Sequence, residues 1–184
     1  FDSITFSPDS EVKIFKDGAF GRSIIKKLEI PPKLETLGVY IYNSYGKRIN
    51  SIEDIELSPQ NQHFQYFYEK VLVGKDSYGK DAIFYIRPDV KEVHIPPCIQ
   101  VLKNNYKSYP IREMEIESII FDDSSQIQRI ESFVFSPSLK KLHIPKSLQK
   151  FAKRVLTMQI IWLISQFHRK IIFFNMSKTS FLCQ

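Results

Sequence analysis

We predict a strand-rich repeat solenoid from this sequence, because one short apolar pattern recurs six times in register and its copies share longer phrases. The pattern L-x-x-L-x-L, with apolar residues at positions one, four and six, occurs six times. The copies are Phe1/Ile4/Phe6, Ile25/Leu28/Ile30, Ile52/Ile55/Leu57, Val90/Val93/Ile95, Ile116/Ile119/Phe121 and Leu139/Leu142/Ile144. Their last residues, at 6, 30, 57, 95, 121 and 144, are 24, 27, 38, 26 and 23 residues apart. Steps of roughly 20–29 residues are typical of leucine-rich repeats. The predicted fold class is therefore an α/β-type leucine-rich-repeat solenoid, β-rich, forming a right-handed superhelix with a short parallel sheet.

The spacing within the pattern has a physical cause. Positions four and six are two residues apart, so on a strand their side chains point to the same face, while the residues between them point outward. A single short strand cannot bury that face, but stacked copies form a parallel sheet over a continuous core. We expect Leu28/Ile30, Val93/Ile95 and Leu142/Ile144 to be equivalent core pairs.

Two longer phrases extend the repeat. Residues 28–37 align with 93–102 and 142–151, and in each copy a proline follows the isoleucine. Proline has no N–H for a strand ladder, so it ends the strand, and apolar residues four and seven beyond the isoleucine return to the core. Residues 6–20 align with 121–135, where polar Ser/Asp turns lead to a returning apolar pair. These matches in register predict the repeat far better than single copies would.

The one long step of 38 residues requires an insertion. The apolar runs Val71-Leu72-Val73 and Ile83-Phe84-Tyr85-Ile86 flank a polar stretch with two glycines, and an aromatic run at 63–68 precedes them. This arrangement predicts a β-hairpin at about residues 71–86 that stands out from the solenoid. The expected domain is the solenoid of residues 1–151, followed by a non-repeat segment at 152–184.

Beyond Phe151 the pattern ends. Residues 154–174 have a helix-like apolar content, but Gln159, Ser165 and Gln166 interrupt it, and no run approaches the ~18 apolar residues of a membrane span. The open alternatives are a C-terminal capping helix, a disordered or mispaired tail, and a membrane-associated segment. We favour the helix, because a solenoid core has to be covered at its end. No signal-like stretch is visible, and a start at Phe1 suggests a fragment.

Composition restricts the partners. The net charge of +6 by itself permits nucleic acid or an anionic membrane. The basic residues are scattered, however, as at Lys26-Lys27 and Lys140-Lys141, and this favours a solvated surface without a nucleic-acid site. Cys98 and Cys183 are too few for a disulfide framework or a zinc site. The sequon at 175–177 matters only in a secretory route.

Motifs for catalysis are absent from the sequence. It has no G-x-S-x-G, P-loop or dinucleotide fingerprint, so we predict a protein that is not an enzyme and has no cofactor or metal. His94 and His143 share one outward repeat position, and about 10 Å between them, at a strand spacing of ~4.8 Å, is too far for one zinc ion. The aspartates at 76, 81, 122 and 123 fit turns better than an EF-hand. We expect Cys98 to be a buried filler.

The phrases at residues 28–38 and 127–142 resemble BspA-like leucine-rich repeats, whose unit runs roughly L-x-x-I-x-I-P-x-x-V-x-x-I-G-x-x-A-F-x-x-C. Residues 55–75 look like the variant of large protozoan sets, and the resemblance covers about residues 1–151. The family's A-F-x-x-C ending is kept only in part, at Ala19-Phe20 and Val134-Phe135, without its cysteine. Members are mostly surface-located or secreted proteins of bacteria and parasitic protists, linked to adhesion. The resemblance thus implies a surface antigen or cell-adhesion role at a cell surface or in secretion.

These observations favour a non-catalytic protein-recognition module, with a host-cell or extracellular-matrix protein as partner and neither nucleic acid nor a small-molecule substrate. The candidate binding site is the concave sheet face. Its outward residues are Lys27, Glu29, Asp54, Glu56, Glu92, His94, Ser118, Ile120, Lys141 and His143. Charges of both signs there favour a protein surface over a polyanion. A plain solvated face, a structural or degenerate fragment, an intracellular interaction scaffold and a hairpin-borne site stay open as alternatives.

Overall fold

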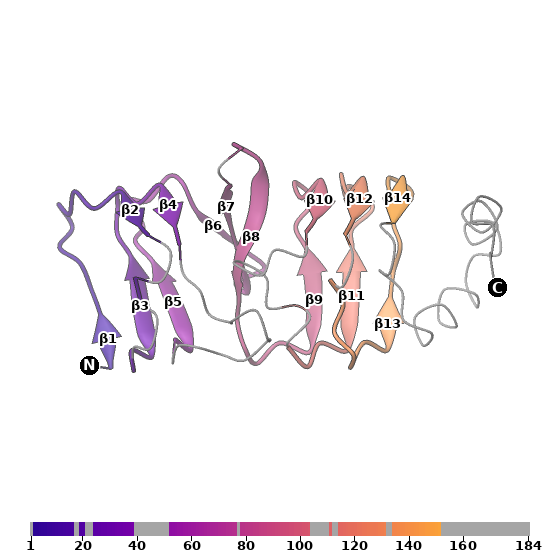
Figure 1. The fold of residues 1–184 in the computed structure, drawn as a ribbon, viewed down its shortest axis with the longest axis horizontal. Coiled ribbons are helices and arrows are strands. Elements are labelled where there is room, and N and C mark those ends of the chain that lie inside the picture. Colours follow the sequence, from indigo (N-terminus) through magenta and orange to yellow (C-terminus); the bar gives the residue numbers. More distant parts are fainter. Residues whose placement is uncertain are drawn as a thin grey trace, which may run out of the picture.

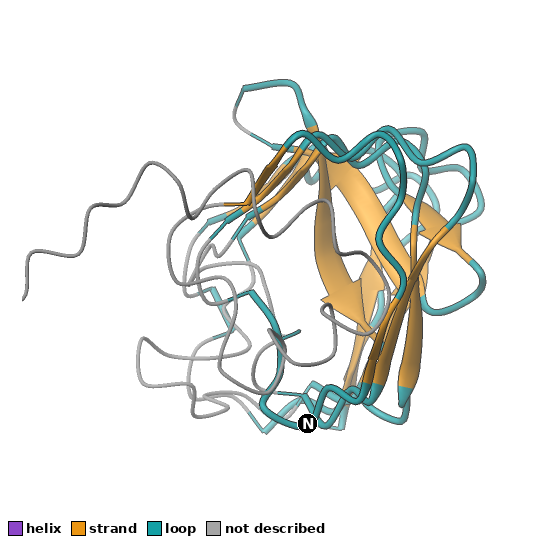
Figure 2. Cartoon of the chain, turned by 90° about the vertical axis from the view of Figure 1, so that its right-hand side faces the viewer, coloured by secondary structure: helices purple, strands orange, loops and turns teal. Residues whose placement is uncertain are grey.

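The chain is a row of short strands stacked along one axis, as the computed structural model shows (Figure 1). The structure describes residues 2–16, 19–20, 24–38, 52–76, 78–103, 111, 114–131 and 134–151. Each complete turn of the stack contributes one strand to each of two sides. A view along the stack shows these sides facing a common interior (Figure 2). The repeat pattern is therefore the pattern of a β-solenoid.

The first side contains the strands that carry the apolar pattern. They are β1 (Ser3–Ile4), β3 (Lys27–Ile30) and β5 (Asp54–Leu57), and then β9 (Glu92–Ile95), β11 (Ser118–Phe121) and β13 (Lys141–Leu142). Within each group all pairs are parallel. Leu28 lies opposite both Ile4 and Ile55, and Ile119 lies opposite both Val93 and Leu142. This confirms the register predicted from the sequence, because equivalent positions of the pattern are paired.

The second side does not confirm the α/β expectation. Where an α/β repeat returns through a helix, the described residues return through short parallel strands. These are β2 (Ile14–Phe15), β4 (Thr36–Leu37), β10 (Val101–Leu102), β12 (Arg129–Ile130) and β14 (Lys150–Phe151). The physical reason is length, because the return in the proline phrase spans only seven residues from Ile30 to Leu37, whereas globular helices average about 11–12. The predicted C-terminal helix and the whole segment 152–184 lie outside the described residues.

Two kinds of turn connect the sides and reach the same register. In the proline phrase, the Pro31 and Pro96 carbonyls accept from the N–H groups three residues on, at 3.2 and 3.1 Å. In the polar phrase, the turn starts at Ser7 and Asp122. Measured from the last residue of the apolar pattern, the returning strand begins two residues later than it does in the proline phrase. The turn accommodates these two extra residues, so Leu37 still pairs with Phe15 and Leu102 still pairs with Ile130. The two phrases therefore alternate without breaking the stack.

Residues 65–86 form a three-stranded antiparallel meander of β6 (Gln65–Phe67), β7 (Val71–Lys75) and β8 (Asp81–Ile86). The expectation that a hairpin here stands out from the solenoid is wrong. Val71, Leu72, Val73, Ile83, Tyr85 and Ile86 are all at most 4% exposed. The meander lies between β5 and β9 in the row of strands (Figure 1). The meander therefore lies inside the stack with β7 and β8 largely buried, and its exposed parts include the loop between them and the turn at Tyr68–Lys70.

Both faces of the meander pack on apolar cores. Leu72 and Tyr85 belong to the N-terminal core with Leu28, Ile30 and Ile55. Val71, Val73, Ile83 and Ile86 belong to the C-terminal core with Val93, Ile95 and Ile119. The pairing shifts between Leu72 and Val73, and skips Phe84, so Phe84 and Tyr85 both pack on the N-terminal side. A strand buried on both faces needs a continuous apolar run, which is what the sequence has here.

Two tyrosine hydroxyls donate hydrogen bonds to the free edge of β5, where it meets the meander. In the other turns, carbonyls such as Lys26 O and Ile119 O accept hydrogen bonds from the next strand of the first side. The equivalent carbonyls of β5 are Glu53 O and Ile55 O, and β5 has no such neighbour. The Tyr85 hydroxyl donates to Glu53 O, and the Tyr66 hydroxyl donates to Ile55 O at 2.5 Å. These bonds satisfy the backbone acceptors that the interrupted repeat would otherwise leave unpaired.

A stability comparison tests the repeat register. Leu28→Ala removes a fully buried side chain (0% exposed) at the centre of the N-terminal core, and we expect a loss of about 2–5 kcal/mol in the free energy of unfolding. The matched exposed variant Lys27→Ala is expected to change it by less than about 0.5 kcal/mol. Denaturant unfolding followed by circular dichroism measures both. Equal losses for the two variants contradict the register.

Gly74→Ala probes the contact between the meander and the N-terminal core. A Cβ at residue 74 lies 2.5 Å from two ring carbons of Phe64, which is buried and stacks edge-on against Phe84 at 5.4 Å. The ring has little room to move, so we expect a loss of about 1–3 kcal/mol in unfolding free energy. In a double-mutant cycle, Phe64→Leu is expected to remove most of that loss. Additive losses contradict the clash.

Candidate binding surface

The residues predicted for the binding face lie on the outer face of the first side, but they do not form one continuous row. Lys27, Glu29, Asp54 and Glu56 lie on β3 and β5, whereas Glu92, His94, Ser118, Ile120 and Lys141 lie on β9, β11 and β13, with His143 just after β13. The end of the meander lies between the two halves (Figure 1). One predicted residue is misplaced, because Ser118 is only 8% exposed between its neighbours on β9 and β13. A serine is too short to rise above longer flanking side chains.

Two carboxylates face one another in the N-terminal half. Glu29 and Glu56 are direct partners in the pairing of β3 with β5. Like charges in this position destabilise a sheet. The Phe6 N–H donates to the Glu29 carboxylate at 3.0 Å, and the Lys27 ammonium lies 3.6 Å from Glu56. Both contacts lie at the protein surface, so they offset only part of the repulsion.

Arg87 ties the meander to this half. Its guanidinium contacts the Asp54 carboxylate at 2.8 Å and donates to the Glu69 carbonyl at 2.9 Å. Its Cζ lies 5.5 Å from the centroid of the Tyr66 ring. A planar cation thus sits among an aromatic face, a carboxylate and a backbone carbonyl. That combination is well suited to arginine, which stacks on rings and presents a fork of N–H donors.

The C-terminal half carries a second cluster around His94. The Tyr68 ring lies 5.3 Å from the His94 ring, and the Tyr68 hydroxyl donates to the Asp122 carboxylate. Asp122 and Glu92 each place an oxygen 3.7 Å from one of the two His94 nitrogens. All four side chains are partly exposed on the outer face, with Tyr68 at 44%. The cluster joins the meander to β9 and to the turn after β11.

The turn that presents Tyr68 is strained. Lys70 N–H donates to Phe67 O at 3.0 Å, and Tyr68 and Glu69 between them have φ angles of 52° and 59°. This two-residue turn matches the twist of a hairpin, but asparagine and glycine usually occupy it. A left-handed conformation costs roughly 1–2 kcal/mol for each residue that has a side chain. The Asp122 hydrogen bond and the His94 contact hold Tyr68 in place despite this cost.

The same hydrogen bond changes the acidity of Tyr68. Asp122, as the acceptor of the hydroxyl proton, raises the pKa of Tyr68 to about 12, and burial and the negative charge of Asp122 add to the effect. The hydroxyl therefore keeps its proton throughout the physiological range. Deeper burial also raises the pKa of Tyr66, whose hydroxyl stays a donor to β5.

Sequence reasoning missed the residues at the centre of the outer face. Tyr66 and Tyr68 belong to the meander, Arg87 follows it directly, and Asp122 was expected only as a turn residue. Asp122 O does accept from Ser125 N at 2.9 Å, but the side chain has the further role described above. The aromatic run at 63–68 marked this segment but did not predict the arrangement, because Tyr66 lies on β6 whereas Tyr68 lies in the left-handed turn after it. Their side-chain partners Arg87, His94 and Asp122 are 21 to 54 residues away and give no local signal.

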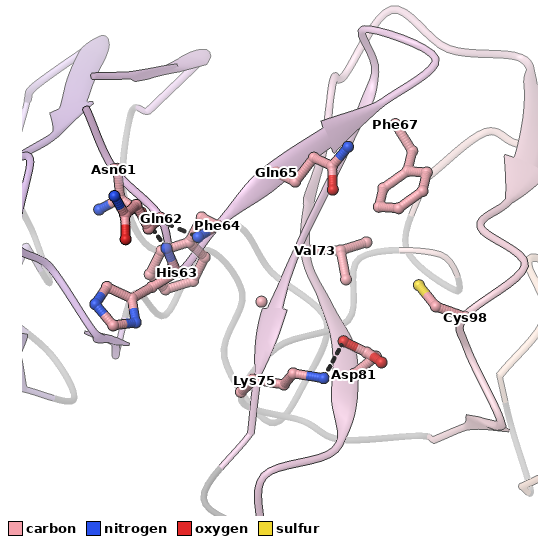
Figure 3. Close-up of a pocket in the computed structure, with 11 residues that line it drawn as sticks. Asn61, Gln62, His63, Phe64, Gln65, Phe67, Val73, Lys75, Asp81 and Cys98 are labelled. Atoms are coloured by element: carbon pink, nitrogen blue, oxygen red, sulfur yellow. Dashed lines mark hydrogen bonds and ion pairs between the residues drawn. The ribbon is translucent and has the colours of Figure 1, made fainter. Parts of the chain in front are cut away.

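A cleft of about 490 Å³ opens on another side of the molecule, between the turn after β5 and the meander (Figure 3). Its lining includes Phe64, Val73 and Cys98, and Lys75 and Asp81 form an ion pair of 2.8 Å on it. Asn61, which is 9% exposed, stabilises the rim of the cleft through four hydrogen bonds. Its side-chain amide donates to Pro31 O and Leu34 O, and its side-chain oxygen accepts from His63 N and Phe64 N. Burial raises the pKa of the half-buried Cys98 thiol, so the thiol is protonated at neutral pH.

The described residues offer no set of three or more His, Cys, Asp or Glu side chains placed to hold a metal ion. His94 and His143 lie on β9 and just beyond β13, with β11 between them. In the same residues, no helix has the length and apolar character that a membrane crossing requires. The described outer face combines charged side chains with aromatic rings.

Comparisons with known proteins add one structural likeness. No family model matches the chain, and no curated protein matches it. Among solved structures, the chain is similar to a leucine-rich cell surface protein from Faecalibacterium prausnitzii, with a TM-score of 0.47 and 17% identity. The match covers 72% of this chain and 33% of that protein's chain, so this chain spans about a third of the neighbour's length.

The Tyr68 to Asp122 bond can be measured by titration. In the folded chain we expect Tyr68 to ionise near pH 12, and Asp122→Asn to move this ionisation toward the ordinary value of about 10. Because the folded pKa is the higher one, the bond's stabilisation is present below pH 10 and is lost as the pH rises toward 12. Tyrosinate absorbance of the chain minus that of Tyr68→Phe isolates the group. An unchanged midpoint in Asp122→Asn rules out the bond.

Proposed function

We propose that this chain is a non-catalytic protein-recognition module that binds its partner through the outer face, as part of a surface-located or secreted protein involved in adhesion or host interaction. The observation that carries the proposal is the outer face itself, where charged and aromatic side chains are held at fixed spacing by a stack of strands. Solenoids bind proteins on such extended faces because the scaffold positions each side chain before contact.

The composition of the face supports a protein as the partner. Tyr66, Tyr68 and Arg87 lie at its middle, and tyrosine and arginine are enriched among the residues that dominate binding energy at protein interfaces. Charged residues of both signs surround them, as the rim of an interface does. Glu29 and Glu56 directly oppose each other at a cost in stability, which is typical of a surface kept for binding.

A second candidate surface is the loop at the exposed end of the meander. Asp76 orders this loop by accepting from Tyr78 N and Lys80 N, both at 2.9 Å, and by pairing with Lys103 at 2.7 Å. Tyr78 is 82% exposed there, with the Lys103 ammonium 5.7 Å from its ring centroid. An ordered aromatic residue on a projecting loop can insert into a partner's pocket. Tyr78→Ser removes the ring and leaves the buried strands intact.

The experiment is a pull-down with the whole chain immobilised, from extracellular-matrix proteins and from cell extract. We expect the double variant Glu56→Lys/Glu92→Lys to lose at least about tenfold of a captured protein, because both sites lie on the outer face and their reversal removes complementarity. Glu29 is left unchanged, since its carboxylate also accepts the Phe6 N–H. Binding is quantified by surface plasmon resonance with the captured protein once it is purified.

The control is Glu131→Lys/Glu11→Lys, which makes the same charge change on residues that follow β12 and precede β2. It is expected to keep binding within about twofold, since neither residue lies on the outer face. Retained binding in the Glu56/Glu92 variant, with loss in Tyr78→Ser, assigns recognition to the loop and contradicts the outer face. If no captured protein depends on any of these residues, a structural repeat fragment is the better explanation.

A further inference from the structure

The outer face already contains one complete binding site for a guanidinium group. Arg87 of the chain itself occupies it, against the Tyr66 ring and the Asp54 carboxylate. Both Arg87 and Asp54 are partly exposed, so this site forms at the surface and not only in the interior. The chain therefore shows which groups this face uses to hold an arginine.

The cluster around Tyr68 repeats that chemistry without a lysine or arginine of its own. Its aromatic surface comes from Tyr68 and His94, and its carboxylates come from Glu92 and Asp122. Among the described residues, the contacts of these two carboxylates are with His94 and Tyr68 and include no lysine or arginine within ion-pair distance. Tyr66 and Tyr68 are two residues apart in the chain, so the occupied and unoccupied clusters are neighbours on the face.

The charge of the face differs from that of the chain. The chain carries a net charge of +6. On the outer face, the carboxylates of Glu29, Asp54, Glu56, Glu92 and Asp122 outnumber the cations of Lys27, Arg87 and Lys141. A basic ligand is therefore repelled by the net charge of the chain and attracted to this face, and such a contrast steers association.

Tyr68 is already held in the cluster by contacts within the chain. Tyr68 is fixed by its left-handed backbone, by its hydrogen bond to Asp122 and by the His94 ring. A fixed ring loses little conformational entropy on binding. It leaves 44% of its surface exposed for contact.

From these observations we infer that the outer face binds a basic segment of a protein partner, with one arginine side chain of the segment against the Tyr68 and His94 rings and its guanidinium paired with the Glu92 and Asp122 carboxylates. This rests on the proposed function and specifies the chemistry of the partner. Arginine suits the site better than lysine, because its planar group stacks on rings while its N–H donors reach carboxylates on both sides.

The test measures binding of short labelled peptides to the whole chain by fluorescence anisotropy at about 0.15 M salt. The probe is a Gly/Ser peptide with two arginines, and its matched forms carry lysine, citrulline or glutamate at the same positions. We expect the arginine peptide to bind at least about tenfold more tightly than the citrulline peptide, which has the same shape without the charge, and more tightly than the lysine peptide. Equal binding of the arginine and citrulline peptides overturns the inference.

Variants locate the site. Glu92→Gln and Tyr68→Asn are each expected to weaken binding of the arginine peptide at least about fivefold. Glu131→Gln removes one negative charge away from the face, so it is expected to bind within about twofold of the wild type. Thermal unfolding monitors the fold. Asparagine suits the left-handed position of residue 68, so lost binding in Tyr68→Asn without a lower Tm assigns the effect to the ring.

The outcomes separate this inference from the proposed function. Capture of a protein that depends on Glu56 and Glu92, together with no preference for the arginine peptide, overturns only the chemistry assigned to the partner. Full arginine-peptide binding in Tyr68→Asn or Glu92→Gln overturns the location. If the glutamate peptide binds better than the arginine peptide, the face selects acidic partners, and the inference is wrong.

Discussion

The backbone carbonyls along the edge of each strand on the first side need hydrogen-bond donors from a neighbour. The rest of the molecule depends on how the edge of β5 obtains them. Carbonyls such as Lys26 O are paired by the next strand of the stack, whereas those of Glu53 and Ile55 have no such strand beside them. Unpaired backbone acceptors in the interior are costly. The hydroxyls of Tyr85 and Tyr66 take the place of the missing N–H groups. The repeat can be interrupted at this point because these two side chains complete it.

The same interruption determines the shape of the functional surfaces. The meander is buried on both faces and divides the core into two. It packs against the core on the β5 side and against the core on the β9 side. On one side of the molecule it leaves the cleft of Figure 3, where the turns of the solenoid are no longer adjacent. On the outer face it introduces Tyr66, Tyr68 and Arg87 between two sets of charged strands. An interruption of the repeat is thus also the source of its most distinctive surface.

The strained turn at Tyr68 and Glu69 fits this picture. Asparagine and glycine satisfy a left-handed turn at lower cost, and neither supplies an aromatic ring. Here the ring is kept, and contacts with His94 and Asp122 compensate for the backbone strain. Backbone strain that is held in place by surrounding contacts is often found at binding sites. The exposed ring and the neighbouring carboxylates give the partner-binding proposal its specific chemistry.

The sequence by itself determined the register of the solenoid, since the pattern depends on neighbours along the chain. Positions four and six must face inward together, and a proline after the isoleucine must end the strand. It also located a pair of apolar strands at residues 71–86, where β7 and β8 lie. Only the tertiary structure decided that these strands are buried on both faces and that each repeat returns through a strand. The same holds for Tyr68, His94 and Asp122, which lie 26 and 28 residues apart in the sequence and meet on one face. Such contacts depend on how turns of the stack are placed against one another, and no periodicity in the chain encodes that placement.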